Sequence, residues 1–231
     1  MKQSWLGRIP AACGIVYVVL GLSEGDGDGS PTLTSSGDEI ARYAAAHPLT
    51  PGRYLVAIAS LFALFVFAAA LHSGLRRKEP PAAVASIVVL AAGILAVAVK
   101  LSSFPALYAL YSSPTPVDGS IARSLWVQPE FAFVLMMLAQ ALMIGAVAVS
   151  GLLHGGIPRW LAATAAVIAV ALPLGVVVAG NSTNFLMELV WLAWVLVASA
   201  TLAIRRPESS NDGSPRRYRE REPAAEPSTG A

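Results

Sequence analysis

Long uninterrupted runs of apolar residues dominate this sequence and restrict what the chain can fold into. Crossing the roughly 30 Å hydrocarbon core of a bilayer takes about 17 to 25 helical residues, at about 1.5 Å for each residue. Six segments meet this requirement, so we predict an all-α, polytopic membrane bundle with six transmembrane helices. The predicted spans are residues 5–23, 54–75, 81–103, 130–153, 157–179 and 184–204.

The composition indicates that lipid is the main surrounding of the chain. Of the 231 residues 55% are hydrophobic and 13% are charged, against about 25% charged residues in soluble domains. The net charge is +2, and the basic residues flank apolar runs instead of lining a continuous face, so no nucleic-acid partner is expected. The single cysteine, Cys13, leaves no intramolecular disulfide to form.

The basic residues favour one orientation, because the cytoplasmic flanks of membrane helices are rich in Lys and Arg. They precede the first predicted span, lie between the second and third and between the fourth and fifth, and follow the sixth: Lys2, Arg8, Arg76, Arg77, Lys78, Arg159, Arg205 and Arg206. The opposite loops hold only Arg42, Arg53 and Arg123. We therefore predict a multi-pass membrane protein with both termini in the cytoplasm.

A short helix is predicted in the first exterior loop. Ser36 is followed three residues later by Glu39, which is the spacing of a capping box at a helix N-terminus. The predicted helix covers residues 37–46, with Ile40, Tyr43 and Ala44 on one face. Two positions are open for it, because it can lie along the membrane surface or roof the bundle.

Two other segments are predicted to lie outside the spans. Residues 104–129 contain several prolines and aromatic residues, so we expect an exterior loop whose aromatic side chains lie at the membrane interface. Residues 207–231 are rich in Pro, Ser, Glu and Arg and cannot bury a core, so we expect a disordered cytoplasmic tail after a transmembrane domain of residues 1–206.

Charged and polar side chains within the predicted spans are the candidate functional residues, because such groups are costly in lipid. Lys100, Glu130 and Glu188 fall at a similar depth near the exterior face, and Gln140 lies in the middle of the fourth span. Glu188 is flanked by apolar residues and needs a partner or a water-filled recess. Lys100 is the expected partner of Glu188, with Glu130 as the other carboxylate that it can reach.

Less specific interpretations of the same residues stay open. Lys100 can extend to the lipid headgroups while Glu130 lies in water. The polar groups can tie helices together through hydrogen bonds instead of lining a ligand cavity, and that role is the commoner one in membrane bundles.

Two histidines fall near the cytoplasmic ends of the second and fourth spans. His72 and His154 lie at a similar depth, so a haem or metal site between them is an alternative, although histidines at such ends are more often interfacial. The sequence contains no zinc-protease, nucleophile-elbow, phosphate-loop or dinucleotide-binding motif. We therefore expect no catalytic residue, no bound metal and no cofactor.

The chain resembles a broad class of six-helix membrane proteins of actinobacteria whose activity is not established. The resemblance rests on the short first span, the segment Gly37-Asp38-Glu39-Ile40-Ala41-Arg42-Tyr43 before the second span, the Leu75-Arg76-Arg77 turn and the Ala- and Val-rich spans. It covers most of residues 5–206 and implies a bacterial plasma membrane, but it carries over no functional residue.

Three functions are compatible with these patterns. The first is a non-enzymatic binding or accessory component of the membrane, whose partners are the lipid bilayer and either another membrane protein or a second copy of the chain. The second is a small-solute or ion transporter that uses Glu188 and Lys100. The third is a membrane enzyme, for which haem binding is one option.

Overall fold

The computed structural model describes residues 9–23, 30–32, 34–113, 115, 117–179 and 181–204. Residues 1–8 and the predicted cytoplasmic tail, residues 207–231, lie outside this part of the chain. The described residues form helices and contain no strand, which confirms the all-α prediction for them. The helices are α2 (Ile9–Ser23), α3 (Gly37–Ala46), α4 (Pro51–Arg76), α5 (Ala85–Ser102), α6 (Phe104–Tyr111), α7 (Gly119–His154), α8 (Arg159–Ala179) and α9 (Asn181–Ile204).

Five helical segments are long and apolar enough to cross a membrane. They are Pro51–Arg76, Ala85–Tyr111, Gly119–His154, Arg159–Val177 and Leu186–Ile204. The helix at the position of the first predicted span, α2, is also apolar but has only 15 residues, and residues 5–8 of that predicted span lie outside the described residues. By length and composition the fold is therefore a helical bundle of the membrane type with five helices of full spanning length.

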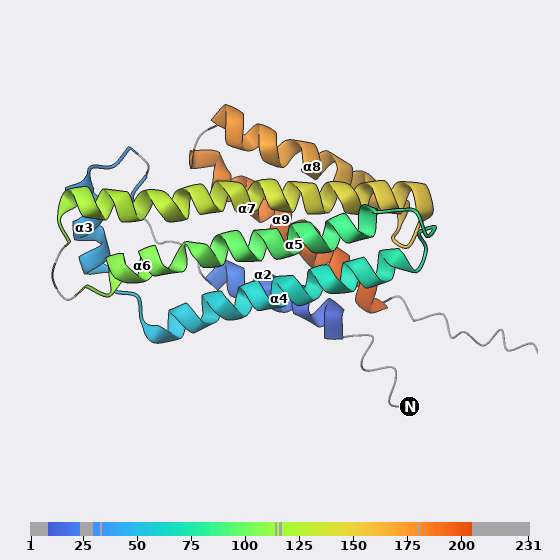
Figure 1. Ribbon diagram of the computed structural model, residues 1–231, viewed down its shortest axis with the longest axis horizontal. Helices are drawn as coiled ribbons and strands as arrows, with labels where there is room; N and C mark the ends of the chain where they lie inside the picture. The colour runs from blue at the N-terminus through green and yellow to red at the C-terminus, as the bar shows by residue number, and fades with distance from the viewer. Residues whose placement is uncertain are drawn as a thin grey trace, which may run out of the picture.

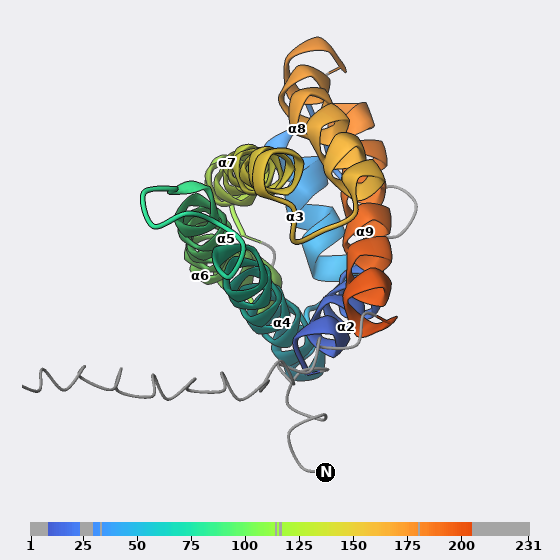
Figure 2. The same cartoon turned by 90° about the vertical axis from the view of Figure 1, so that its right-hand side faces the viewer.

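The long helices and α2 form a closed ring. Each helix packs against the next in the order α2, α4, α5, α7, α8, α9 and back to α2 (Figure 2). The start of α2, the end of α9 and the connections from α4 to α5 and from α7 to α8 lie at one end of the bundle (Figure 1). Helices α3 and α6 lie at the opposite end (Figure 1).

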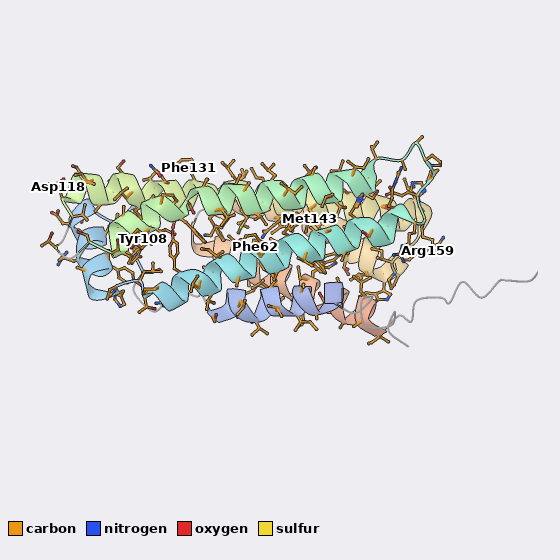
Figure 3. All side chains as sticks on the ribbon, turned by 60° about the horizontal axis from the view of Figure 1, so that its bottom comes forward. Phe62, Tyr108, Asp118, Phe131, Met143 and Arg159 are labelled. Atoms are coloured by element: carbon orange, nitrogen blue, oxygen red, sulfur yellow. The ribbon has the colours of Figure 1, made fainter. Side chains whose placement is uncertain are left out.

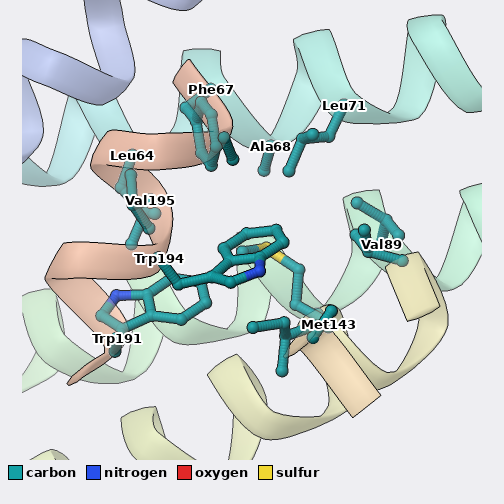
Figure 4. Close-up of a cluster of buried hydrophobic side chains, with 14 of the residues drawn as sticks. Leu64, Phe67, Ala68, Leu71, Val89, Met143, Trp191, Trp194 and Val195 are labelled. Carbon is teal, nitrogen blue, oxygen red and sulfur yellow. The ribbon is translucent and has the colours of Figure 1, made fainter. Parts of the chain in front are cut away.

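Large apolar side chains from several helices fill the inside of the ring. Phe67 and Leu64 of α4, Met143 of α7 and Trp191 of α9 each have at most 1% of their surface exposed (Figure 4). The rings of Trp191 and Trp194 stack with their centroids 6.1 Å apart. Dense packing of this kind is typical of protein interiors and holds the ring as one body.

The outer surface of the bundle is apolar as well. Side chains such as Phe62, Phe131 and Val177 are 57%, 62% and 81% exposed, and Phe62 and Phe131 point outward from α4 and α7 (Figure 3). Apolar residues on the inside and the outside of the same helices are expected when the surrounding solvent is hydrocarbon.

Residues 104–129, where an exterior loop is predicted, are mainly helical. Helix α6 follows α5 directly after Ser103, and the break coincides with Pro105, whose nitrogen has no proton to donate to the preceding turn. Helix α7 begins at Gly119, with the Asp118 carboxylate accepting a hydrogen bond from the Ser120 N–H, and continues through Pro129. Its 36 residues extend about 54 Å, well beyond the hydrocarbon core of a bilayer.

Helix α3 occupies the range that the capping box predicts and roofs one end of the bundle. The Ser36 N–H donates to the Glu39 carboxylate (2.8 Å), and the Glu39 N–H donates to the Ser36 hydroxyl (3.3 Å). The buried face of α3 includes Ile40 and Ala44, which pack with α6 and the first turns of α7 in a small core completed by the following residues: Ala41, Leu110, Tyr111, Ala122 and Trp126. We call α3, α6 and these first turns of α7 the platform.

Backbone contact holds the start of α3 against the start of α7. A Cβ atom at Gly37 would lie 1.9 Å from the carbonyl oxygen of Gly119, a distance that no side chain can occupy. The Arg123 guanidinium of α7 also donates a hydrogen bond to the carbonyl oxygen of Ser35 (2.9 Å). The glycines therefore permit an approach between the two helix ends that any other residue would prevent.

Candidate functional site

The hydroxyl group of Tyr17 is the centre of a polar cluster inside the ring. It donates to Glu188 Oε1 (3.3 Å), and it accepts hydrogen bonds from Trp191 Nε1 (3.1 Å) and Gln140 Nε2 (3.4 Å). Tyr17 is 4% exposed, while Gln140 and Trp191 are fully buried. We call Tyr17, Gln140, Glu188 and Trp191 the Tyr17 cluster.

Three helices position the cluster. Glu188 and Trp191 are three residues apart, so they lie on one face of α9, and this face packs against α2, which carries Tyr17. Gln140 reaches the same hydroxyl from α7, across the inside of the ring. The cluster thus connects three separate parts of the chain through one tyrosine oxygen.

The donors and acceptors define the direction of each hydrogen bond. The indole and amide nitrogens can only donate, so they use the lone pairs of the Tyr17 oxygen, and the phenolic proton goes to Glu188. Within the part of the chain that the structure describes, the amide oxygen of Gln140 has no hydrogen-bond partner, although it is fully buried. Buried amide oxygens normally have a partner, and one without any costs free energy.

Lys100 and Glu188 lie in different surroundings, so the structure does not show the pairing that we expected. The ammonium of Lys100 lies 5.4 Å from the ring centroid of Phe133 on α7. Glu188 meets Tyr17 instead, on α9, and α5 and α9 are not neighbours in the ring. Equal depth in a membrane does not place two residues on adjoining helix faces. Glu130 is partly buried on α7, ten residues before Gln140.

A second polar cluster lies at the opposite end of the bundle, around Glu79 in the connection from α4 to α5. The carboxylate accepts hydrogen bonds from the Ser86 N–H (3.0 Å) and the Ser86 hydroxyl (2.6 Å). Arg76 contributes a weaker ion pair, with its Nη1 at 3.9 Å from Glu79 Oε2. The carboxylate caps the first turn of α5, where the N-cap residue Val84 has no side chain that can do so.

The surroundings of Glu79 lower its pKa. Burial of the carboxylate would raise the pKa, but the hydroxyls of Ser150 and Ser86, the Ser86 N–H and nearby His154 outweigh this effect. The pKa of Glu79 therefore lies below its ordinary value of 4.5, and the ionised form is the one that the folded state stabilises.

Both candidate haem or metal ligands lie near this second cluster. His72 Nδ1 is 2.8 Å from the carbonyl oxygen of Ser86, and because a carbonyl can only accept, Nδ1 carries the proton. His154 is the last residue of α7, and its electrostatic interaction with Glu79 is one of the effects that lower the pKa of that carboxylate. Among the described residues no group of three or more His, Cys, Asp and Glu side chains is arranged to hold a metal ion.

A shallow groove lies between α5 and α7 near the platform. It has a volume of about 360 Å³ and is lined by Val99, Ser102, Ser103, Val127, Gln128, Phe131, Ala132 and Leu135. Phe131 and Leu135 are more than half exposed, so the groove belongs to the outer surface and does not open into the Tyr17 cluster.

The described structure is thus a closed helical bundle of the membrane type with one polar cluster inside it and another at one end. Compared with known protein families, with curated proteins and with solved structures, the chain matches none at a significant level.

Sequence reasoning missed Tyr17 and Glu79, although both left a signal. A tyrosine hydroxyl in the middle of an apolar helix needs a hydrogen-bond partner, which is a reason to pair it with the polar residues of other spans. Glu79 reads as the end of a solvated charged run, Arg76-Arg77-Lys78-Glu79. The α5 helix that follows starts without a Ser, Thr, Asp or Asn cap. The N–H groups of its first turn therefore need an acceptor from another part of the chain.

Proposed function

We propose that the protein is a six-span integral protein of the bacterial plasma membrane with both termini in the cytoplasm. Three observations support this proposal. The outer surface is apolar, α2 is needed to close the ring, and the start of α2 lies at the same end of the bundle as the end of α9 (Figure 1). The Lys and Arg residues of the connections from α4 to α5 and from α7 to α8 also lie at that end.

Reporter fusions test this topology. Fusions after Arg77 and after Arg206 should both report a cytoplasmic position, and a fusion after Gly29 should report an exterior one. An exterior signal after Arg206 would leave an odd number of crossings and would refute both the six spans and the shared side of the termini.

We further infer that the protein is a non-enzymatic binding or accessory component, and that the platform is its binding surface. The platform supports this inference because of its structure and its position on the bundle. It is a folded element with its own small core, held on the bundle by the contact of Gly37 with Gly119, and it extends beyond the length that a bilayer requires.

The exposed side of the platform has the mixed character of a protein-binding surface. Tyr108 and Ile121 are 57% and 53% exposed, and charged residues such as Arg42 and Arg123 are also exposed. Aromatic and Arg side chains are enriched at protein interfaces. Either a second membrane protein or a second copy of this chain would fit such a surface.

Site-specific crosslinking in native membranes tests this assignment. A photocrosslinking residue at Ile121 should give a discrete adduct heavier than the 24.0 kDa chain, and a second, differently tagged copy shows whether the partner is the same protein. Val177 serves as the matched control, because it is 81% exposed on a helix that spans the membrane and should give only lipid adducts. Protein adducts at Val177 and none at Ile121 would contradict the assignment.

The transporter alternative requires Glu188 and Lys100 on one pathway, and their different surroundings do not favour it. The haem alternative uses His72 and His154, and the absorption spectrum of the purified protein tests it directly.

A further inference from the structure

The amide oxygen of Gln140 is the observation from which a ligand site can be inferred. It is a strong acceptor on a fully buried side chain, and the described residues provide no donor for it. Its own amide nitrogen is held by Tyr17, so the side chain is fixed in place and cannot turn to find another partner without breaking that bond. Such an oxygen needs a donor or a cation that the described residues do not supply.

The same hydroxyl that holds Gln140 also holds a carboxylate. Tyr17 lies within hydrogen-bond distance of both Glu188 Oε1 and Gln140 Nε2, so the carboxylate of α9 and the amide of α7 share one neighbour. Trp191 closes the cluster on the α9 side with a third hydrogen bond to that hydroxyl. The result is a small group of oxygen atoms with one formal negative charge, surrounded by apolar side chains.

We propose that Glu188 and Gln140, positioned by their shared hydrogen bonds to Tyr17, form an intramembrane binding site for one small monovalent cation, a proton or Na⁺. Carboxylate and amide oxygens are ligands that hard cations prefer. A single carboxylate matches a single positive charge, whereas a divalent ion would leave net charge in an apolar region. An added proton would bind the Glu188 carboxylate, which is the one ionisable group of the proposed pair.

The charged groups on the surrounding helices are compatible with a bound monovalent cation. Tyr17 of α2 is in contact with Glu188, and Arg159 of α8, which also packs against α9, lies at the far end of its helix. Lys100 on α5 is directed over Phe133. The nearest helix ends are those of α2 at Ser23 and α9 at Asn181, which place the site about 10 Å below the platform end of these helices.

Thermal unfolding of the full-length protein in detergent tests the site. The Tm is measured in NaCl, in KCl and in choline chloride at constant ionic strength and fixed pH, and separately across pH in choline chloride. A cation that binds only the folded state stabilises it by RT ln(1 + [L]/Kd), where [L] is the free concentration of the cation. At a concentration of about 100 times the dissociation constant, Na⁺ should raise the Tm by about 5 to 10 °C.

Two variants locate the effect. Glu188→Gln retains an acceptor oxygen for Tyr17 but removes the charge, so it should abolish the response to Na⁺ or to acidification. Gln140→Leu removes the amide oxygen and should weaken the apparent affinity about tenfold or more, as the loss of a supporting group does at other metal sites. Glu130→Gln is the matched control, because it removes a carboxylate from α7 ten residues away and should leave the response unchanged.

The results distinguish the two cations and the case in which neither binds. A response to Na⁺ that Glu188→Gln removes identifies a sodium site, and a response to acid alone that the same variant removes identifies a proton site. Wild-type protein that responds to neither cation would overturn the proposal and leave the Tyr17 cluster as a structural hydrogen-bond network. A response that persists in both variants would also overturn it, by placing the cation elsewhere.

If Glu188→Gln fails to fold, the indole of Trp191 provides a second measurement. Its N–H donates to the Tyr17 hydroxyl, so its fluorescence should change when a cation binds. The spectrum of the wild type minus that of Trp191→Phe isolates this signal. A cation titration without any change in the difference spectrum would again overturn the proposal.

Discussion

Replacing Glu79 by Gln should destabilise the protein, although the residue lies in a connection that reads from the sequence as a solvated charged run. Its carboxylate accepts hydrogen bonds from the N–H and the hydroxyl of Ser86, and its side chain is fully buried. Hydrogen bonds to a charged group contribute about 1.5 to 3 kcal/mol each, and glutamine retains one neutral acceptor. We therefore expect a loss of about 2 kcal/mol in the free energy of unfolding at neutral pH.

We assign most of this loss in the free energy of unfolding to the two hydrogen bonds from Ser86. The contact with Arg76 is 3.9 Å long, and the arginine side chain is 39% exposed, so solvent screens it. Arg76 also donates to the carbonyl oxygen of Ala83 (2.8 Å), which it continues to do in the variant. For a chain of this size, a loss of about 2 kcal/mol corresponds to a fall in Tm of about 4 to 8 °C.

The pH dependence supplies an independent measurement with a defined sign. The pKa of Glu79 in the folded state is lower than its ordinary value of 4.5, so its contribution is fully present above that pH. The contribution is lost as the pH falls through the folded-state pKa, because the carboxylate must then be protonated. The free energy of unfolding of the wild type should therefore fall more steeply below about pH 4.5 than that of Glu79→Gln.

Thermal unfolding in detergent, followed by circular dichroism between pH 3 and pH 8, measures both effects. Other carboxylates titrate in the same range, so the quantity of interest is the difference between the wild-type and variant curves. Ser86→Ala is the matched variant, because it removes the hydroxyl donor and retains the N–H, and it should cost about half as much. Equal Tm values at neutral pH together with parallel curves in acid would refute the role of Glu79 as the cap of α5.

Three further substitutions test other parts of the structure. Tyr17→Phe removes the shared hydroxyl of the Tyr17 cluster and should cost about 2 to 4 kcal/mol in thermal unfolding; a neutral effect would show that the cluster does not form. Gly37→Val would force a side chain onto the carbonyl oxygen of Gly119 and should expose α3 to protease, whereas Gly52→Val, with open space around its Cβ, should not; equal cleavage of both would contradict the close approach. Lys100→Met keeps the apolar stem and removes a cation–π contact, so unfolding should change by about 1 kcal/mol or less; a loss of about 3 kcal/mol or more would indicate a buried ion pair instead.

The positions of the helices could be predicted from the sequence because the signals for them are local. A helix satisfies its own backbone hydrogen bonds, so a long apolar run is sufficient to specify a segment that is stable in lipid. The α3 helix is likewise specified by neighbours in the sequence, with Ser36 and Glu39 capping its first turn. Local signals were less reliable at Pro129, which reads as a helix boundary but lies inside α7.

The partners of the polar residues were decided by the tertiary structure. Helices α4 and α7 are apolar on nearly every side, so their sequences do not show which face meets lipid and which meets another helix. Depth could be counted along each span, and on that basis Lys100 was the expected partner of Glu188. The order of the helices around the ring places Tyr17 beside Glu188 and leaves Lys100 over Phe133. The sequence by itself determined the length and the apolar character of the helices, whereas only packing determined their neighbours, because in lipid the hydrophobic pattern no longer distinguishes inside from outside.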